Sequence, residues 1–313
     1  FIGSGTPQIS GVATTQAGFV LYQAIRLGIN TTAGTGPTFV TIDGLDVATN
    51  NNGLNLTSGA AIVATGCNSI TVRNCIAHHS GAGIYAYNTP NFLVEDCEVH
   101  STDGLAGNSV VTATGSISNI FTGAIVAEAV SDGSIIRRNR VHDCMGRGIL
   151  IGGPGSTSAN CTVINNFVWN VTGLGATGLT QTLYGGGIVV RRAPGSVVAN
   201  NSVSMSTTTL NAPCLAIQQT FVAAEISNNL LRQTGVGGCC VRFESTASAV
   251  PAIFDYNAYD VGVGAFACAV ATTTYTLAAW QALASPNMAG KELNTLLGAA
   301  NFVSSTDLHV LPT

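Results

Sequence analysis

Short apolar runs alternate with polar pairs in one recurrent pattern along the chain. In segments such as ITVRNCIAH (70–78) and TVINNFVWN (162–170), apolar residues flank a polar pair that usually contains Asn. The second member of each pair forms a column with successive spacings of 22, 42, 27, 35, 28 and 28 residues. Units of about 20 to 50 residues that cannot bury a face alone are typical of a stacked solenoid. The column consists of Cys75, Cys97, Asn139, Asn166, Asn201, Asn229 and Asn257.

A second recurrent element, a short strand that often begins with Gly, lies between these segments. GIYAY (83–87), GILIG (148–152) and GGIVVRR (186–192) alternate apolar or β-branched residues with a period of two, which predicts strands. Two or three such strands per unit describe one coil of a parallel β-helix, with equivalent residues about 4.8 Å apart in successive coils. An inward Asn then needs a backbone or Asn partner, so we expect an asparagine ladder.

The Asn column, the segment RVHDCMGRGILI (140–151) and the tail from Trp280 to Pro312 resemble the right-handed parallel β-helix repeat superfamily. The resemblance extends over about residues 38–312 and implies an all-β solenoid, here of about eight coils with a C-terminal cap. That superfamily includes carbohydrate-active enzymes, phage tailspikes and bacterial surface proteins. Fold alone does not choose among these functions.

The repeat divides the chain into three expected parts. Residues 1–37 show no repeat and are expected to be an irregular segment or a partial coil, and we interpret the chain as a mature or excised piece of a longer protein. Residues 38–274 form the predicted parallel β-helix. Residues 275–313 break the repeat and contain one predicted helix, Leu277–Ala284, in a segment expected to cap the last coil.

Two Gly-rich insertions lengthen individual coils. Ser101–Thr122 accounts for the spacing of 42 residues, and Gly173–Gly186 lengthens a later coil on the same corner. We expect both to form loops, which in solenoids often flank a binding face. The alternative is that they are inert surface loops.

Composition excludes several classes of function. Only 8% of the 313 residues are charged, about a third of the usual fraction. Ten Arg and the single Lys291 do not supply the cationic clusters that nucleic-acid binding needs, and no apolar run is long enough to span a membrane. Few Lys among abundant Thr, Ser, Asn and Gly favour a secreted or cell-surface location.

The outward positions of the Gly-led strands carry the strongest candidate chemistry. Aromatic rings stack on sugar rings, and charged or amide groups bind hydroxyls, so this face suits an extended polysaccharide. Hydrolysis needs two carboxyl groups about 5 to 9.5 Å apart, whereas Glu128 and Glu244 are expected roughly 19 Å apart. A lyase needs a cation and a base, and we predict no catalytic residue. The predicted substrate-binding residues are Tyr85, Tyr87, Glu128, Arg191, Gln218, Arg242 and Glu244.

Three imidazoles form a second outward column. His78, His100 and His142 are expected to stack at about 4.8 Å, a spacing that could hold a divalent transition metal. The alternative, which we favour, is a stripe of surface His without metal, and we expect no cofactor. An Arg cluster at 137–143 with Arg147 is expected to form ion pairs with Glu95 and Glu98 or, alternatively, an anionic-glycan patch.

The nine Cys follow the same register. Cys214 lies level with Cys240, which predicts a disulfide from Cys214 to Cys240 or Cys239. Cys75 and Cys97 replace Asn in the inward column, where we expect buried thiols.

These features favour an extracellular structural or adhesive β-helix segment of a larger surface, appendage or fibre protein, with glycan binding as one role. The alternative is a polysaccharide lyase or glycoside hydrolase acting along the β-helix face. The expected partners are a polysaccharide or further copies of the chain in a larger assembly, not nucleic acid.

Overall fold

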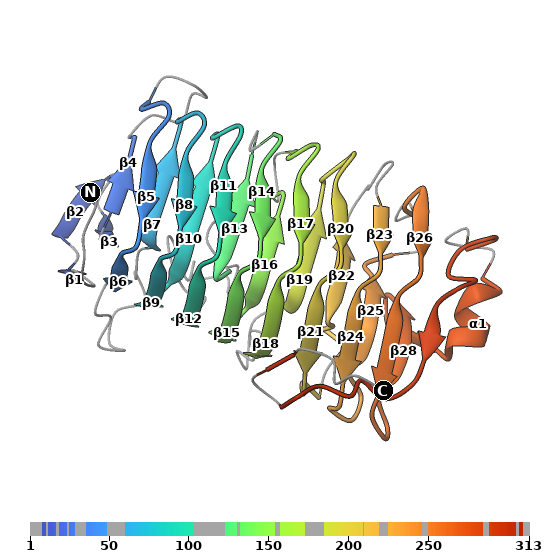
Figure 1. Cartoon of the computed structure of the whole chain (residues 1–313). Coiled ribbons are helices and arrows are strands. Elements are labelled where there is room, and N and C mark those ends of the chain that lie inside the picture. Colours follow the sequence, from blue (N-terminus) through green and yellow to red (C-terminus); the bar gives the residue numbers. More distant parts are fainter. Residues whose placement is uncertain are drawn as a thin grey trace.

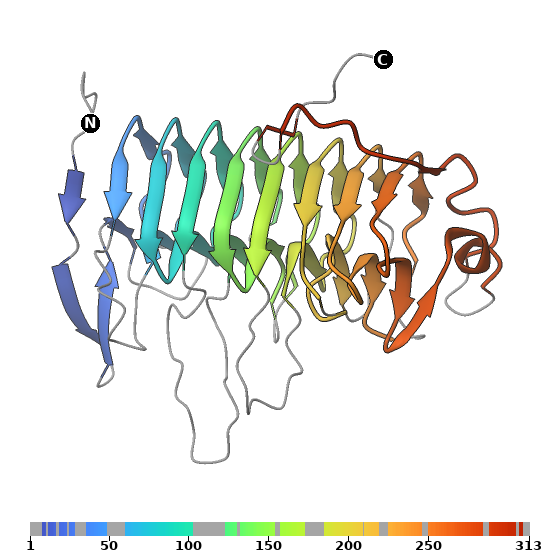
Figure 2. The same ribbon diagram turned by 90° about the horizontal axis from the view of Figure 1, so that it is seen from below.

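Short parallel strands stack into three long sheets in the computed structural model (Figure 1). Each complete coil contributes one strand in turn to sheet 1, sheet 2 and sheet 3, and the strands follow one another in series from end to end (Figure 2). This arrangement confirms the predicted all-β parallel solenoid. The structure describes residues 8–10, 12–16, 19–23, 25–28, 36–48, 60–102, 123–129, 132–153, 157–172, 185–208, 210–218, 225–245, 250–283, 288–304 and 307–308.

The strands have the following bounds. Sheet 1 contains β5 (Thr41–Asp43), β8 (Thr71–Arg73), β11 (Leu93–Glu95), β14 (Ile135–Arg137), β17 (Thr162–Ile164), β20 (Val197–Ala199), β23 (Glu225–Ser227) and β26 (Ile253–Asp255). Sheet 2 contains β1 (Gln8–Ser10), β6 (Asp46–Ala48), β9 (Ile76–Ser80), β12 (Glu98–Thr102), β15 (Arg140–Met145), β18 (Phe167–Thr172), β21 (Ser202–Met205), β24 (Leu230–Gln233), β27 (Ala258–Val261) and β30 (Leu296–Leu297). Sheet 3 contains β4 (Ile25–Leu27), β7 (Ala60–Thr65), β10 (Ala82–Tyr87), β13 (Ile125–Glu128), β16 (Arg147–Ile151), β19 (Gly186–Arg191), β22 (Leu215–Gln218), β25 (Cys239–Phe243), β28 (Phe266–Val270) and the antiparallel β29 (Thr273–Tyr275). β2 (Val12–Gln16) and β3 (Phe19–Gln23) form a separate hairpin.

The two members of the polar pair have different tasks at the turn from sheet 1 to sheet 2. The first adopts a left-handed backbone, with φ of 57° at Asn165 and Asn200 and 54° at Asn228, a conformation that Asn tolerates well. The second turns inward, and from Asn139 to Asn257 each Nδ2 donates to the Oδ1 of the next Asn at 3.0 or 3.1 Å. The inward amides are therefore satisfied within an asparagine ladder that runs along the solenoid.

The leading Gly of several sheet 3 strands is required by close packing inside the solenoid. A Cβ added to Gly148 would lie 2.5 Å from the carbonyl oxygen of Gly187 and 2.7 Å from Cγ1 of Val168. A Cβ added to Gly187 would lie 2.4 Å from Cγ1 of Val203. The absent side chain thus lets sheet 3 approach the Val column of sheet 2 closely enough to fill the core.

The C-terminal residues pack against the last coil and then against sheet 2. Helix α1 (Leu277–Gln281) is shorter than predicted, and Ala284 lies outside the described residues. Its Trp280 is fully buried, with its ring centroid 5.2 Å from that of Phe243. Beyond β30, Phe302 and Leu308 join an apolar cluster that contains Trp169 of β18, where the chain crosses sheet 2 (Figure 1). The domain boundaries and the capping role stay predictions.

A buried carboxyl group closes the asparagine ladder at this end. Oε1 of Glu292 accepts from Nδ2 of Asn257 at 3.0 Å and from the hydroxyl of Tyr259 at 2.5 Å. Oε2 accepts from the indole N–H of Trp280 at 3.1 Å. Burial raises the pKa of Glu292 to about 7 in spite of these donors.

The thiols behave as small apolar groups. All nine Cys are buried and free, so the predicted disulfide from Cys214 is wrong. The Sγ atoms of Cys214 and Cys240 lie 3.1 Å and 3.3 Å from backbone carbonyl oxygens of β24, so each thiol can donate to the backbone. Cys75 and Cys97 are buried thiols, as predicted.

The two insertions fall largely outside the described residues, at 103–122 and 173–184, and their roles stay predictions. Within the described part of the chain, no helix is both long and apolar enough to cross a membrane.

Candidate functional site

The predicted substrate-binding residues lie together on the outer face of sheet 3. The strand register aligns Tyr87 with Glu128 and Arg191 with Gln218, and Glu244 follows in the same column directly after β25. Tyr85 and Arg242 lie two positions earlier in their strands. Equivalent residues of parallel strands are about 4.8 Å apart, so the column forms a row along the solenoid axis.

Most of this row is buried, although it faces away from the solenoid interior. Tyr85, Glu128, Arg191, Gln218 and Arg242 are each less than 10% exposed. Only Tyr87 and Glu244, at the two ends of the row, are partly exposed. The outward apolar residues between them form a second cluster separate from the core, made of Ala60, Val63, Ala82, Tyr85, Val126, Leu150, Val189 and Ala216. Whether the seven residues bind a substrate stays a prediction.

Glu128 has an environment that favours its neutral form. Burial raises the pKa of its carboxyl to about 7, even though Arg147 and Arg191 lower it. The hydroxyl of Tyr85 lies 3.5 Å from Oε2 of Glu128. Gly153 makes room for the carboxyl, since a Cβ there would lie 2.3 Å from Oε1. A carboxyl group with this pKa can both accept and release a proton near neutral pH.

Arg147 is a member of this cluster that the sequence analysis assigned elsewhere. It is 3% exposed, and burial lowers its pKa to about 10, with a further decrease from Arg191. Its position directly before Gly148, at the start of the predicted strand, was the available signal. Of the rest of the Arg cluster, Arg137 forms the expected ion pair with Glu95 at 2.7 Å, and Arg138 also pairs with Glu95 at 2.8 Å. The guanidinium of Arg140 instead lies 5.3 Å from the ring centroid of Trp169. Glu98, the other expected partner, contacts His142 instead.

Two buried side chains of the row have polar groups without hydrogen-bond partners. Neither Nε2 nor Oε1 of Gln218 has a partner within the described part of the structure, and Nε of Arg191 also lacks one. A buried polar group left in this state costs about 1 to 3 kcal/mol. Such exceptions are rare in folded proteins and call for an explanation such as a ligand or an ion.

The charges of the cluster suit an anionic ligand. Three guanidinium groups, of Arg147, Arg191 and Arg242, lie on this face with two carboxyl groups, of which Glu128 favours its neutral form. The two carboxyl groups are four strands apart, about 19 Å at the strand spacing. This separation is too large for the paired acids of a glycoside hydrolase.

The predicted His column on sheet 2 is a continuous stack of rings. The centroids of His78 and His100, and of His100 and His142, are 5.1 Å apart, and Trp169 extends the stack at 4.3 Å from His142. Partial burial lowers the pKa of His100, and the flanking His142 and His78 lower it further. Among the described residues, no group of three or more His, Cys, Asp or Glu is arranged to hold a metal ion.

Residues 27–183, half of the chain, match the family described as right handed beta helix region. No curated protein matches the chain. One similar solved structure is a double mutant of the periplasmic alginate epimerase AlgG, with a TM-score of 0.46 and 11% identity over 82% of this chain and 49% of that one. A second is the A-module of the mannuronan C-5 epimerase AlgE4 of Azotobacter vinelandii, with a TM-score of 0.43 and 11% identity over 84% of this chain and 65% of that one.

The tailspike protein of E. coli bacteriophage HK620, solved with a pentasaccharide, has a TM-score of 0.40 and 12% identity over 84% of this chain and 44% of that one. This chain therefore spans about half the length of the AlgG epimerase and just under two thirds of the AlgE4 module. The family match, together with the three parallel sheets, leads to one conclusion: the chain belongs to the right-handed β-helix family.

Proposed function

We propose that the outer face of sheet 3 binds an extended acidic polysaccharide. The observation that carries this proposal is that Nε2 and Oε1 of Gln218 and Nε of Arg191, two buried residues at adjacent positions of one row, have no hydrogen-bond partner among the described residues. A sugar carboxylate is an acceptor for the guanidinium, and sugar hydroxyls can both donate to and accept from the amide. Both unmet requirements are then satisfied by one ligand.

The geometry of the row supports a ligand that lies along the solenoid axis. Tyr87 at one end and Glu244 at the other are partly exposed, whereas the other five predicted residues are buried. Tyr87 offers an aromatic surface for a sugar ring at the N-terminal end. A chain of several sugar units, rather than a single sugar, contacts all of these positions.

Affinity electrophoresis in gels that contain a polyuronate or a neutral glucan tests the proposal. We expect retardation by the polyuronate, and at least tenfold weaker binding for Arg191→Met and for Gln218→Leu. Arg73→Met is the matched control, because Arg73 is an exposed Arg on sheet 1 that pairs with Asp43 at 2.8 Å. Equal retardation by both polymers, or equal loss in the control, contradicts the proposal.

A second candidate function is cleavage of the same polysaccharide by a lyase reaction, favoured by the pKa of Glu128. In its ionised form the carboxylate takes the proton at C5 of a uronate, the electron pair forms the C4–C5 double bond, and the C4–O bond breaks. The departing oxygen then gains a proton, and Arg147 or Arg191 neutralises the sugar carboxylate. Because the pKa of Glu128 is about 7, the rate rises as the pH passes through 7 from below.

Absorbance of the unsaturated uronate product distinguishes cleavage from binding alone. The lyase proposal predicts product with wild type and none with Glu128→Gln, while polyuronate binding persists in the variant. Binding without product, in wild type over a range of polyuronates, leaves the glycan-binding role and rejects the lyase.

We infer further that the chain serves as a secreted or cell-surface segment of a larger surface, appendage or fibre assembly. The low charge, the single Lys and the regular stacking of coils support this role. Negative-stain microscopy of the longer protein tests it: ordered filaments or surface layers are expected, and isolated intracellular monomers contradict it.

A further inference from the structure

A residue with a left-handed backbone follows each ring of the stack on sheet 2. An extended strand alternates its side chains between two faces, and a left-handed residue interrupts the alternation, as a bulge does. The ring and the residue after it therefore both lie on the outer side of the sheet. These residues, with φ between 48° and 52°, are His79, Ser101, Asp143 and Asn170.

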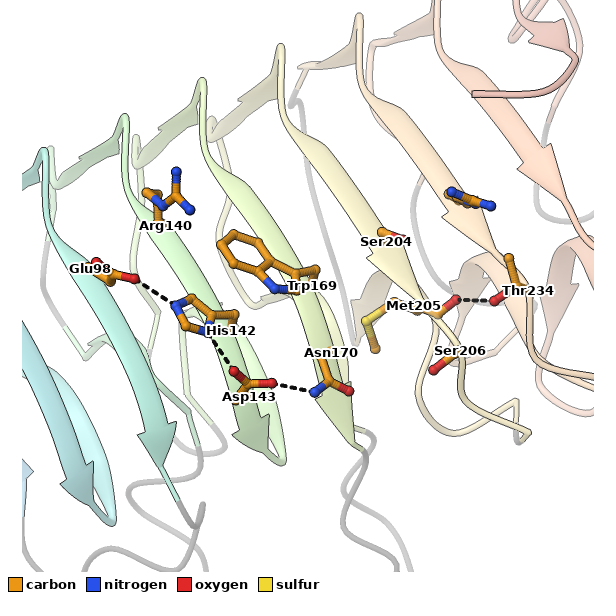
Figure 3. Close-up of a pocket in the computed structure, with 11 residues that line it drawn as sticks. Glu98, Arg140, His142, Asp143, Trp169, Asn170, Ser204, Met205, Ser206 and Thr234 are labelled. Atoms are coloured by element: carbon orange, nitrogen blue, oxygen red, sulfur yellow. Dashed lines mark hydrogen bonds and ion pairs between the residues drawn. The ribbon is translucent and has the colours of Figure 1, made fainter. Parts of the chain in front are cut away.

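The partner of the ring nitrogen Nδ1 differs from one ring to the next. Figure 3 shows His142 with Asp143 at one ring nitrogen and Glu98 at the other, at 2.7 Å and 2.9 Å. Nδ1 of His100 instead faces the hydroxyl of Ser101 at 3.0 Å. Neither arrangement brings a second imidazole nitrogen to the first.

Only His78, among the described members of this column, has a second imidazole at its Nδ1. This atom lies 2.5 Å from Nδ1 of His79, and the two rings meet at an interplanar angle of 78°. Nε2 of His78 lies 2.6 Å from Oδ1 of Asp46. An ionised carboxylate only accepts, so a neutral His78 ring carries its proton on Nε2 and directs the lone pair of Nδ1 toward His79.

We propose that the Nδ1 atoms of His78 and His79 bind one Cu²⁺ ion, with water in the remaining coordination positions. Imidazole nitrogen is a preferred ligand of Cu²⁺. A metal-binding His usually donates its other ring N–H to a carboxylate, which fixes the tautomer and the ring orientation, and Asp46 occupies that position. When the ion binds, the proton that the two Nδ1 atoms share leaves to solvent.

The separation of the two nitrogens favours Cu²⁺ over Zn²⁺. With metal–nitrogen bonds of about 2.0 Å, two ligands at the right angle of a square-planar site are about 2.8 Å apart, and two ligands of a tetrahedral site are about 3.3 Å apart. Starting from 2.5 Å, the square-planar geometry of Cu²⁺ needs the smaller movement. His79 is exposed, so its ring can make this movement without disturbing the core.

Titration with Cu²⁺, followed by calorimetry and electron paramagnetic resonance, tests the site. We expect one tightly bound Cu²⁺ per chain, with imidazole nitrogen coupled to the ion, and at least tenfold weaker binding of Zn²⁺. All nine thiols are buried, so they do not compete for the ion in the folded protein. His79→Asn is expected to weaken Cu²⁺ binding at least tenfold, and Asn tolerates the left-handed backbone. Asp46→Asn keeps both ligands and weakens binding about tenfold.

His142→Gln is the matched control, because His142 belongs to the same column but its Nδ1 faces a carboxylate. We expect its affinity for Cu²⁺ to stay within twofold of wild type. The site is independent of the acidic-glycan face on sheet 3, so Arg191→Met keeps Cu²⁺ binding and His79→Asn keeps polyuronate binding. An equal loss in His142→Gln, an unchanged affinity in His79→Asn, or Zn²⁺ binding as tight as that of Cu²⁺ overturns the inference.

Discussion

Removal of one amide from the middle of the asparagine ladder is expected to destabilise the solenoid strongly. The side chain of Asn201 donates to the carbonyl oxygens of Val163 and Ala199 at 2.9 and 3.0 Å and to Oδ1 of Asn229 at 3.0 Å. Its own Oδ1 accepts from the backbone N–H and from Nδ2 of Asn166, both at 3.0 Å. All of these atoms lie in the buried interior.

The magnitude follows from these bonds. Asn201→Ala leaves the buried backbone N–H of Asn166 without its acceptor, which costs about 2 kcal/mol, and the loss of the remaining bonds adds a similar amount. We therefore expect a decrease of about 4 kcal/mol in the free energy of unfolding. Asn201→Cys costs about half as much, because the equivalent Cys97 directs its Sγ to the carbonyl oxygen of Glu95 at 3.3 Å but sulfur accepts weakly.

Equilibrium urea unfolding followed by far-UV circular dichroism measures both differences. Asn200→Gly is the matched control, since Asn200 is an exposed neighbour with φ of 57° that Gly adopts without strain. We expect a change below about 0.5 kcal/mol in this variant. An Asn201→Ala protein within about 1 kcal/mol of wild type refutes the conclusion that the ladder stabilises the fold.

Three further predictions concern stability. The folded-state pKa of Glu292 is about 7, above the ordinary 4.5, so its contribution to the free energy of unfolding is fully present below pH ~4.5 and falls by about 3 kcal/mol as the pH rises through 7. In urea unfolding, Glu292→Gln removes this part of the pH dependence of stability, and an unchanged pH dependence contradicts the assignment. Gly148→Ala forces its Cβ into the carbonyl of Gly187 and into Val168, and we expect it to lower the free energy of unfolding by about 1 to 3 kcal/mol. Thermal unfolding measures this change, and a curve equal to that of wild type contradicts the tight packing inferred at Gly148. All nine thiols react with an alkylating reagent in urea without reductant, because all are free, and fewer than nine adducts by mass spectrometry reveal a disulfide.

The ladder could be predicted from the sequence because inward polar residues at repeated positions have few ways to be satisfied. The left-handed conformation of Asn165 and its equivalents was not predicted, since the apolar and polar pattern identifies the inward member of each pair but not the backbone φ of its neighbour. The register placed Cys214 level with Cys240 correctly. Level register does not by itself decide whether two adjacent thiols are bonded, and both are free.

The row on sheet 3 could be located because strand residues alternate with a period of two. Its burial could not be predicted, because burial of an outer face depends on what packs over it and not on the strand itself. Arg147 was missed for a related reason: it sits at the first position of β16, where the alternation gives least information about direction.

A crystal structure of the chain with a bound acidic oligosaccharide tests the central claim most directly. The account predicts a sugar carboxylate within hydrogen-bond distance of Arg191, sugar hydroxyls on both Nε2 and Oε1 of Gln218, and a ligand that runs along sheet 3 from Tyr87 toward Glu244. An oligosaccharide bound on another face, with Gln218 and Arg191 still without ligand contacts, contradicts it.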